Sequence, residues 1–157
     1  MTRPISGTRN QIDDHMAAWQ LHVELATRIA VVPLPRDQGL LSEALSSLEV
    51  LADRVREILR ERGPHDTPGE MSAFQTAAWA VTEDIVGPLL TRWKRRLVSV
   101  VAASTGAGPV DRERAWPDRS ALRDDLERAR LQLTTIAVEL AELAGASSLI
   151  ADHEEIR

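Results

Sequence analysis

The sequence of 157 residues contains no cysteine and no tyrosine, and it has one phenylalanine. The lack of cysteine excludes disulfides, zinc sites with cysteine ligands and thiol catalysis. No apolar run approaches the ~20 residues that a membrane-spanning helix needs. The first eleven residues are polar and do not resemble a signal peptide. We therefore expect a cytoplasmic protein without a transmembrane segment.

The residues that are present suit one small domain with an aliphatic core. Hydrophobic residues make up 43% of the chain, and four tryptophans supply most of the aromatic volume. A folded chain of this length removes roughly 70% of its unfolded surface from water, so one core is sufficient. The formal net charge of −5 argues against a surface that broadly coats nucleic acid or anionic membrane. Any such binding must be local.

The first predicted helix spans Asp13 to Val32 and ends at Pro33, which cannot continue a helix. Its apolar residues fall on two stripes rather than one, when placed at 100° per residue. One stripe consists of Ile12, Met16, Trp19, Val23, Ala26 and Ala30, and the other of Leu21, Leu25, Ile29 and Val32. Such a helix is expected to be the central helix of the fold or to contact a partner as well.

Two further amphipathic segments follow. The second helix is predicted from Leu40 to Arg62, with Gly63-Pro64 ending it. A third apolar pattern begins near Glu70 and continues to Val101, but Gly87-Pro88 interrupts it. Proline lacks an N–H group, and its ring opposes the carbonyl four residues back. We therefore predict two helices here, with a kink or break between them.

The segment from Ser104 to Pro117 is rich in glycine and proline and is predicted to be the longest loop. The last helix follows, with Asp118 or Ser120 as its cap and Gly145 just past its end. No alternating strand pattern competes with these helices. The predicted fold is all-α, a mainly antiparallel four- to five-helix bundle in residues 1–146, with an acidic tail at 147–157.

Motifs for catalysis, metal binding or cofactor binding are not found. Glu-x-x-His pairs, the His-Glu-x-x-His motif, the phosphate-binding loop and the Gly-x-Ser-x-Gly elbow do not occur. His15 and His22 lie seven residues apart, but further ligands for a metal are missing. We interpret both as packed histidines with one hydrogen bond each, and we predict no metal and no cofactor.

Arg60 and His65 form an Arg-x4-His spacing, and Arg9 with His15 forms Arg-x5-His. Both spacings are similar to the loose motif of the HEPN superfamily of helical nucleases. In such a site arginine would hold the scissile phosphate while histidine transfers a proton. Gly63-Pro64 interrupts the helix between Arg60 and His65, so a HEPN-like RNase is the alternative rather than the favoured function.

The densest group of charges is Arg92-Trp93-Lys94-Arg95-Arg96. Trp93 shares a helical stripe with Leu97 and is predicted to lie in the core, while the four cations, here called the basic ridge, project outward. These cations are expected to pair with Asp84, with acids of the last helix or with the acidic tail. The alternative is that they bind an acidic protein or nucleic acid.

Three segments carry a resemblance: Ala52 to Pro64, Pro88 to Leu97, and Trp116-Pro117 with the helix that ends at Gly145. Together they resemble an uncharacterised family of small all-helical actinobacterial proteins. Members tend to have Arg-Pro-Phe-Leu-x-x-Trp-His-Pro-x-Leu where this chain has Gly87 to Leu97, so that Gly87, Leu89, Lys94 and Arg95 differ. The resemblance implies a helical fold and an occurrence among bacterial conflict or anti-phage defence genes, where such proteins act as adaptors or regulators.

The favoured function is therefore a non-enzymatic helical interaction or adaptor protein, a component or regulator of a bacterial defence system. The predicted partner-binding residues are Leu21, Leu25 and Ile29 of the first helix and Arg92, Lys94, Arg95 and Arg96 of the basic ridge. The expected partner is a protein, with a second copy of the chain as one option. A nucleic-acid-binding regulator that uses the basic ridge is a further alternative.

Overall fold

The computed structural model describes residues 6–28, 33–34, 39–103 and 106–150. All regular elements in these ranges are helical, and no strand occurs among them, so the predicted all-α fold is confirmed. In chain order they are α1 (Ser6–Thr27), α2 (Leu41–Arg62), α3 (Ala73–Trp79), the π-helix η2 (Ala80–Val86), α4 (Gly87–Ala102), α5 (Pro109–Ala115) and α6 (Arg119–Leu143).

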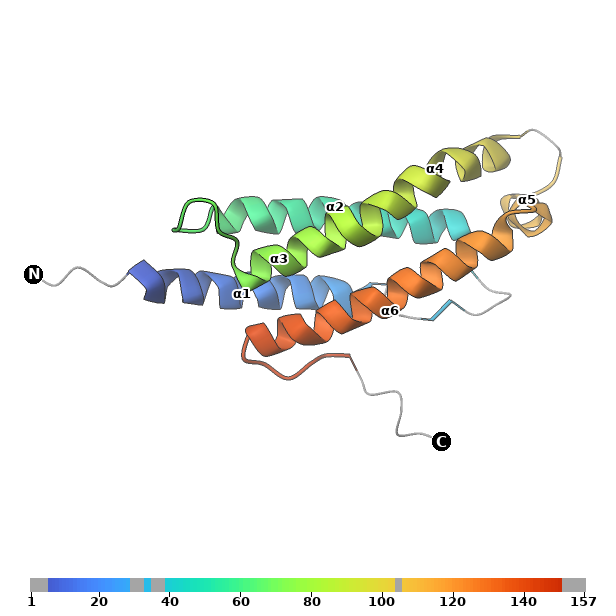
Figure 1. Ribbon diagram of the computed structural model, residues 1–157. Helices are drawn as coiled ribbons and strands as arrows, with labels where there is room; N and C mark the ends of the chain where they lie inside the picture. The colour runs from blue at the N-terminus through green and yellow to red at the C-terminus, as the bar shows by residue number, and fades with distance from the viewer. Residues whose placement is uncertain (1–5, 29–32, 35–38, 104–105, 151–157) are drawn as a thin grey trace, which may run out of the picture.

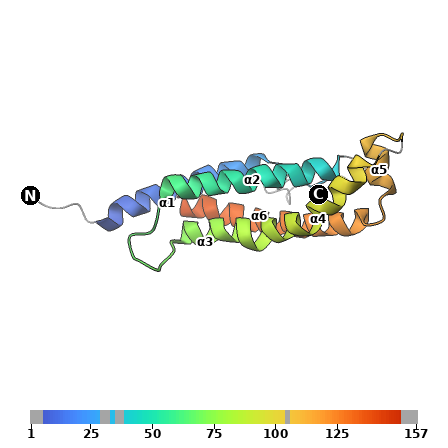
Figure 2. The same ribbon diagram turned by 90° about the horizontal axis from the view of Figure 1, so that it is seen from above.

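The long segments α1, α2, α3 through α4, and α6 run in alternating directions along the bundle (Figure 1). α1 packs against α2 and α6, and the run from α3 through η2 to α4 packs against the same two helices. Figure 2 shows the same arrangement from above, with α5 at the end where α4 finishes and α6 begins. The arrangement is a mainly antiparallel bundle, as the sequence predicts.

One stripe of each helix faces a common aliphatic core. α2 shows the pattern most clearly, because its buried residues recur every three or four positions. They are Leu41, Ala44, Leu45, Leu48, Leu51, Ala52, Val55 and Ile58. Full burial of each leucine or isoleucine contributes about 1.5–3 kcal/mol. The bounds of α2 differ from the predicted Leu40–Arg62 by one residue.

α1 differs from its prediction in both extent and orientation. It begins at Ser6 rather than Asp13 and ends at Thr27, and residues 29–32 of the predicted helix lie outside the described residues. Leu21 and Leu25 are fully buried, whereas Met16 is 62% exposed and Trp19 is 36% exposed. Only one of the two apolar stripes therefore enters the core, and Met16 and Trp19 of the other stripe face solvent.

Gly87-Pro88 lies inside a helical run rather than at a break. The residues from Ala73 to Ala102 are helical throughout, and the N–H of Gly87 donates to the carbonyl of Thr82, five residues back. This π-type bond changes the hydrogen-bonding register one residue before Pro88, which has no N–H to donate. The predicted separation into two helices is therefore replaced by a π segment, and the kink itself stays a prediction.

The predicted loop between Ser104 and Pro117 contains a helix, α5, so the prediction of a structureless loop is wrong there. α5 buries the carboxylate of Glu113 against the start of α2. Glu113 accepts hydrogen bonds from the backbone N–H groups of Leu41, at 2.7 Å, and Ser42, at 3.0 Å. These N–H groups have no partner within their own helix. Glu113 thus caps α2 from a distant part of the chain.

α6 ends as the glycine pattern predicts. Gly145 has φ 64°, and its N–H donates to the carbonyl of Glu142, while the N–H of Ala146 donates to that of Ala141. These two bonds form a Schellman motif. Beyond it the chain turns back, and Ile150 packs against the core. Leu149 and Ile150 of the predicted tail thus contact the bundle, and 151–157 lie outside the described residues.

Candidate interaction surfaces

His22 joins three parts of the chain. Its ring is fully buried, with Nδ1 2.6 Å from the carbonyl oxygen of Ala137 in α6. The backbone N–H of Leu149 donates to Nε2 at 2.9 Å. A carbonyl oxygen only accepts, so Nδ1 carries the proton and Nε2 is the acceptor, which is a neutral imidazole. The ring therefore connects α1 to α6 and to the segment after α6.

The packing that the sequence predicts for both histidines is found at His22 but not at His15. The sequence predicts one hydrogen bond for each histidine, whereas His22 forms two. His15 is exposed and forms no hydrogen bond to any residue that the structure describes, so its prediction as a packed histidine is wrong. The backbone N–H that reaches His22 comes from the end of the chain, which spacing along α1 cannot indicate.

Trp19 stacks on the buried histidine and forms an exposed apolar face. The ring centroids of Trp19 and His22 are 5.4 Å apart, with an angle of 29° between the ring planes. Leu149, whose backbone binds the same imidazole, is 53% exposed. We name Met16, Trp19 and Leu149 the Trp19 face. Tryptophan and methionine are enriched in protein interfaces relative to other surfaces.

The predicted binding residues of the first helix require a correction. Leu21 and Leu25 are fully buried between α1 and the rest of the core, so neither side chain can reach a partner in this fold. Ile29 lies outside the described residues. The packing of α1 on α2 and α6 covers the stripe of Leu21 and Leu25 rather than that of Met16 and Trp19. The exposed apolar side of α1 is that of Met16 and Trp19.

Trp93 lies in the core, as predicted, with 1% of its surface exposed. Its indole N–H donates to Asp125 of α6 at 2.7 Å. The ring meets Trp116 edge-on, with centroids 5.8 Å apart. Trp93 therefore fixes the position of α4 relative to α6 and to the segment after α5.

The cations of the basic ridge are largely engaged within the chain. The guanidinium of Arg92 lies 4.9 Å from the centroid of the Trp93 ring and 3.2 Å from the carboxylate of Asp125. Arg96 lies 5.6 Å from the same ring. The prediction that an acid of the last helix pairs with the ridge is confirmed by Arg92.

Lys94 and Arg95 complete the ridge. Lys94 pairs with Glu49 of α2, a partner that the sequence pattern does not predict. Arg95 is exposed and forms no ion pair with a residue in the described ranges. A groove of about 240 Å³ separates α2 and α4 beside these residues. Leu45, Leu97 and Val98 line it, and Lys94 and Glu49 pair across it.

Arg60 and His65 lie on either side of the end of α2. Arg60 is exposed on α2, and no hydrogen bond joins it to His65 among the described residues. The ring of His65 accepts a hydrogen bond from the N–H of Thr67 within its own loop, at 3.2 Å. The spacing that resembles a HEPN motif is therefore not accompanied by a hydrogen bond between the two side chains, and their catalytic role stays a prediction.

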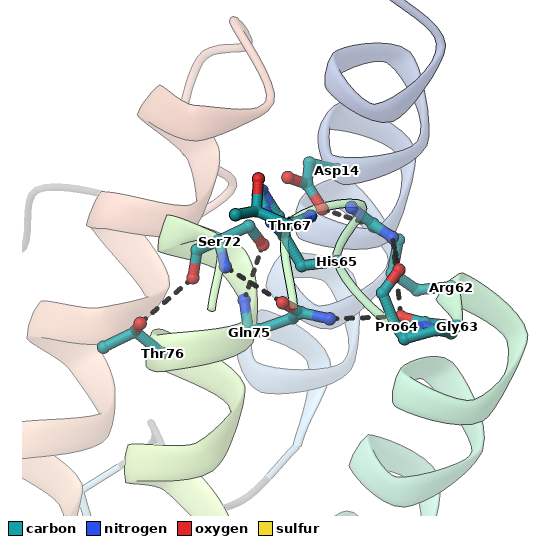
Figure 3. A network of polar contacts seen from close by, with 9 residues as sticks. All are labelled: Asp14, Arg62, Gly63, Pro64, His65, Thr67, Ser72, Gln75 and Thr76. Atoms are coloured by element: carbon teal, nitrogen blue, oxygen red, sulfur yellow. Dashed lines mark hydrogen bonds and ion pairs between the residues drawn. The ribbon is translucent and has the colours of Figure 1, made fainter. Parts of the chain in front are cut away.

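The buried arginine near this loop is Arg62, which lies in a polar network at one end of the bundle (Figure 3). Its Nε is 2.5 Å from the carboxylate of Asp14, and its Nη1 donates to the carbonyl of Pro64 at 3.0 Å. Gln75 of α3 donates to the carbonyl of Gly63 at 3.1 Å. These bonds tie α1, α2 and α3 together and give Arg62 a structural role.

Within the described residues no three histidine, cysteine or acidic side chains gather as they would around a metal ion. None of the helices in those ranges has both the length and the hydropathy to cross a bilayer.

The resemblance to small helical actinobacterial proteins rests on sequence segments alone. Comparison of the chain with protein-family models, curated proteins and solved structures returns no significant match.

Proposed function

We propose that this chain is a non-enzymatic helical interaction protein that binds another protein through the Trp19 face. The observation that carries the proposal is the position of Trp19, which is partly exposed while one side of its ring rests on His22. Met16 precedes it by three residues on α1 and is 62% exposed. Burial of such side chains by a partner releases about 25 cal/mol per Å² of apolar surface.

Trp19 is held in place before any partner arrives. Two hydrogen bonds fix the imidazole of His22, and Trp19 stacks on that fixed ring. Side chains that are already ordered lose less conformational entropy on binding. Tryptophan anchors of this kind commonly dominate the energy of a protein interface.

The biological role is proposed from the sequence resemblance. Small helical proteins of the family that this chain resembles occur among bacterial defence genes, so we propose an adaptor or regulator of an effector encoded nearby. The nucleic-acid alternative has less support, because Arg92 and Lys94 are paired with carboxylates of this chain. A phosphate backbone would have to compete with those pairs.

The test is affinity purification from the native host with matched variants. The wild-type chain is compared with Met16→Gln/Trp19→Ser and with the control Trp79→Ser, because Trp79 is 54% exposed on a different helix. We expect a protein recovered by the wild type and by Trp79→Ser but lost from the double variant. Circular dichroism checks that all three chains fold.

Two results would contradict the proposal. One is recovery of the same proteins by the wild type and the double variant. The other is recovery of no protein, together with a strictly monomeric mass by size-exclusion chromatography and light scattering. A dimer that the double variant abolishes would identify the partner as a second copy.

A further inference from the structure

A second surface lies on the bundle between α3 and α6, which are neighbours at the end where α6 finishes (Figure 1). It is an open groove of about 690 Å³. On the α3 side the groove is lined by Ala73, Ala77 and Ala80, whose spacing places them along one side of the helical run. Alanines at a contact allow a close approach of another helix, since the distance between packed helices depends on side-chain size.

The α6 side of the groove combines aliphatic and acidic residues. Ile136 and Leu143 line it, half-buried against the core. Glu139 and Glu142 also line it, and both are exposed. No arginine or lysine contributes to the lining. The groove is thus an apolar floor with negative charge along one wall.

These two carboxylates are not neutralised within the described part of the chain. Neither side chain forms an ion pair or hydrogen bond there, whereas the exposed Glu127 of the same helix pairs with Arg130. Glu139 and Glu142 also lie near the C-terminal end of α6, where the helix dipole is negative, and the last turn holds no basic residue. The negative end of the helix dipole therefore repels the charges of Glu139 and Glu142, and a cation from a partner would offset this repulsion.

We propose that this groove binds an amphipathic helix of another protein, with aliphatic side chains on one face and lysine or arginine beside them. The aliphatic side chains enter between the alanines of α3 and Ile136 and Leu143 of α6, and the cations pair with Glu139 and Glu142. The proposal rests on the proposed function only in requiring a protein partner. It adds a second surface, which an adaptor needs to join two partners.

The length of the groove sets the size of the bound segment. Ala73 to Ala80 and Ile136 to Leu143 each cover seven residue steps, which is about 10 Å at the helical rise of 1.5 Å. About two turns of partner helix therefore contact the groove. Helices that dock in grooves use anchors at i, i+3 or i+4, and i+7, which matches this length.

The experiment uses two labelled helical peptides that differ only in charge. Both carry leucine at three anchor positions, flanked by lysine in one peptide and by glutamate in the other. Fluorescence anisotropy with the full chain at low salt measures both affinities. We expect the basic peptide to bind about tenfold or more tightly than the acidic one, because two attractive pairs replace two repulsive ones. Added salt should reduce this preference.

Charge reversal supplies the matched variants. Glu139→Lys/Glu142→Lys should shift the preference to the acidic peptide, while the control Glu61→Lys/Asp124→Lys, with the same change in net charge at exposed positions elsewhere, should keep it. Equal affinities for the two peptides, or an unchanged preference in the groove variant, would overturn the proposal.

Self-association is a separate outcome. If the wild type associates at rising concentration and Glu139→Lys/Glu142→Lys does not, the occupant is a second copy, and the proposal of a different protein is wrong. Loss of peptide discrimination leaves the host-protein experiment with Trp19 unaffected. Failure at the groove and failure at the Trp19 face can therefore be told apart.

Discussion

The indole N–H of Trp93 donates to Asp125 across the interface between α4 and α6, at 2.7 Å. The same carboxylate pairs with Arg92 and with Arg128. Asp125 thus satisfies a buried donor and neutralises neighbouring cations at once. Asp125 therefore allows the cationic segment from Arg92 to Arg96 to pack beside the buried ring of Trp93.

Asp125→Ala should destabilise the fold by about 1–3 kcal/mol, because the buried indole N–H loses its partner. The free energy of unfolding is measured with urea. The control is Asp124→Ala, since Asp124 is exposed and its replacement should change stability by less than about 0.5 kcal/mol. Equal stability of the two variants would show that the hydrogen bond contributes little.

Gly87→Ala tests the π segment. Helix propensity alone predicts a gain of about 1 kcal/mol for alanine over glycine in a helix. At Gly87, however, a Cβ atom would lie 2.8 Å from the carbonyl oxygen of Thr82, which is backbone. We expect a net loss of about 1–3 kcal/mol in urea unfolding, as in overpacked cores. Gly108→Ala is the control, since its Cβ would meet nothing within 4 Å, and a stabilised Gly87→Ala would contradict the π-type bond.

Glu113→Ala should weaken the start of α2. Loss of the carboxylate leaves the N–H groups of Leu41 and Ser42 without their acceptor, which costs about 1–2 kcal/mol for a helix cap. Hydrogen exchange at these two amides should become faster, while that at Val55 in the middle of α2 changes only with global stability. Unchanged exchange at Leu41 would show that water replaces the cap without cost.

Glu127→Gln should have an effect that depends on pH. A hydrogen bond from Arg130 lowers the pKa of Glu127 below its ordinary value of 4.5. A lowered pKa in the folded state stabilises the fold above the unfolded pKa, and this contribution disappears as the pH falls through the folded pKa. Because the pair is on the surface, the variant should lose less than about 1 kcal/mol at pH 7.

Urea unfolding at several pH values measures this contribution. The difference between the wild type and Glu127→Gln should shrink as the medium becomes more acidic than the ordinary glutamate range, where the wild-type side chain is also neutral. A difference that stays constant over this range would assign the loss to packing rather than to charge.

Glu142→Gln should stabilise the fold, whereas Glu127→Gln should destabilise it. Glu142 has no side-chain partner among the described residues and lies at the negative end of α6, so removal of its charge should stabilise the fold by about 0.3–1 kcal/mol. The measurement is urea unfolding at low salt, repeated at high salt, which should reduce the gain. A loss of stability would indicate a contact that neutralises Glu142.

The sequence predicts helices well where one apolar stripe is present. α2 has one stripe and a Gly-Pro stop, and its predicted bounds differ from the structure by a residue. Trp93 is likewise placed in the core by its spacing from Leu97. For α1 both stripes recur at helical spacing, so periodicity alone does not decide which is buried. Trp19 stacks on His22, and the chain after α6 holds the ring of His22. The Trp19 face therefore depends on a contact that the pattern along α1 does not indicate.

The sequence pattern predicts neither α5 nor the acidic groove, and the reasons differ. Gly108 and Pro109 indicate a loop, yet proline in the first turn followed by Asp111 is also a signal for a helix start, which α5 uses. The groove brings together Ala77 and Glu139, which are far apart in the sequence. No local pattern relates them, because only the packing of α3 on α6 makes them neighbours.

The π segment also determines the direction in which the basic ridge points. A π turn holds more residues than an α turn, so the residues after Gly87 meet the core in a different register from those before Ala80. If Ala80–Val86 were α-helical at unchanged length, the register of the following residues would shift by one residue, which would rotate α4 by about 100°. Trp93 would then leave Asp125, and the cations of the ridge would turn with it. The outward direction of Arg95 is thus set about two turns upstream, by a π segment that contains no basic residue.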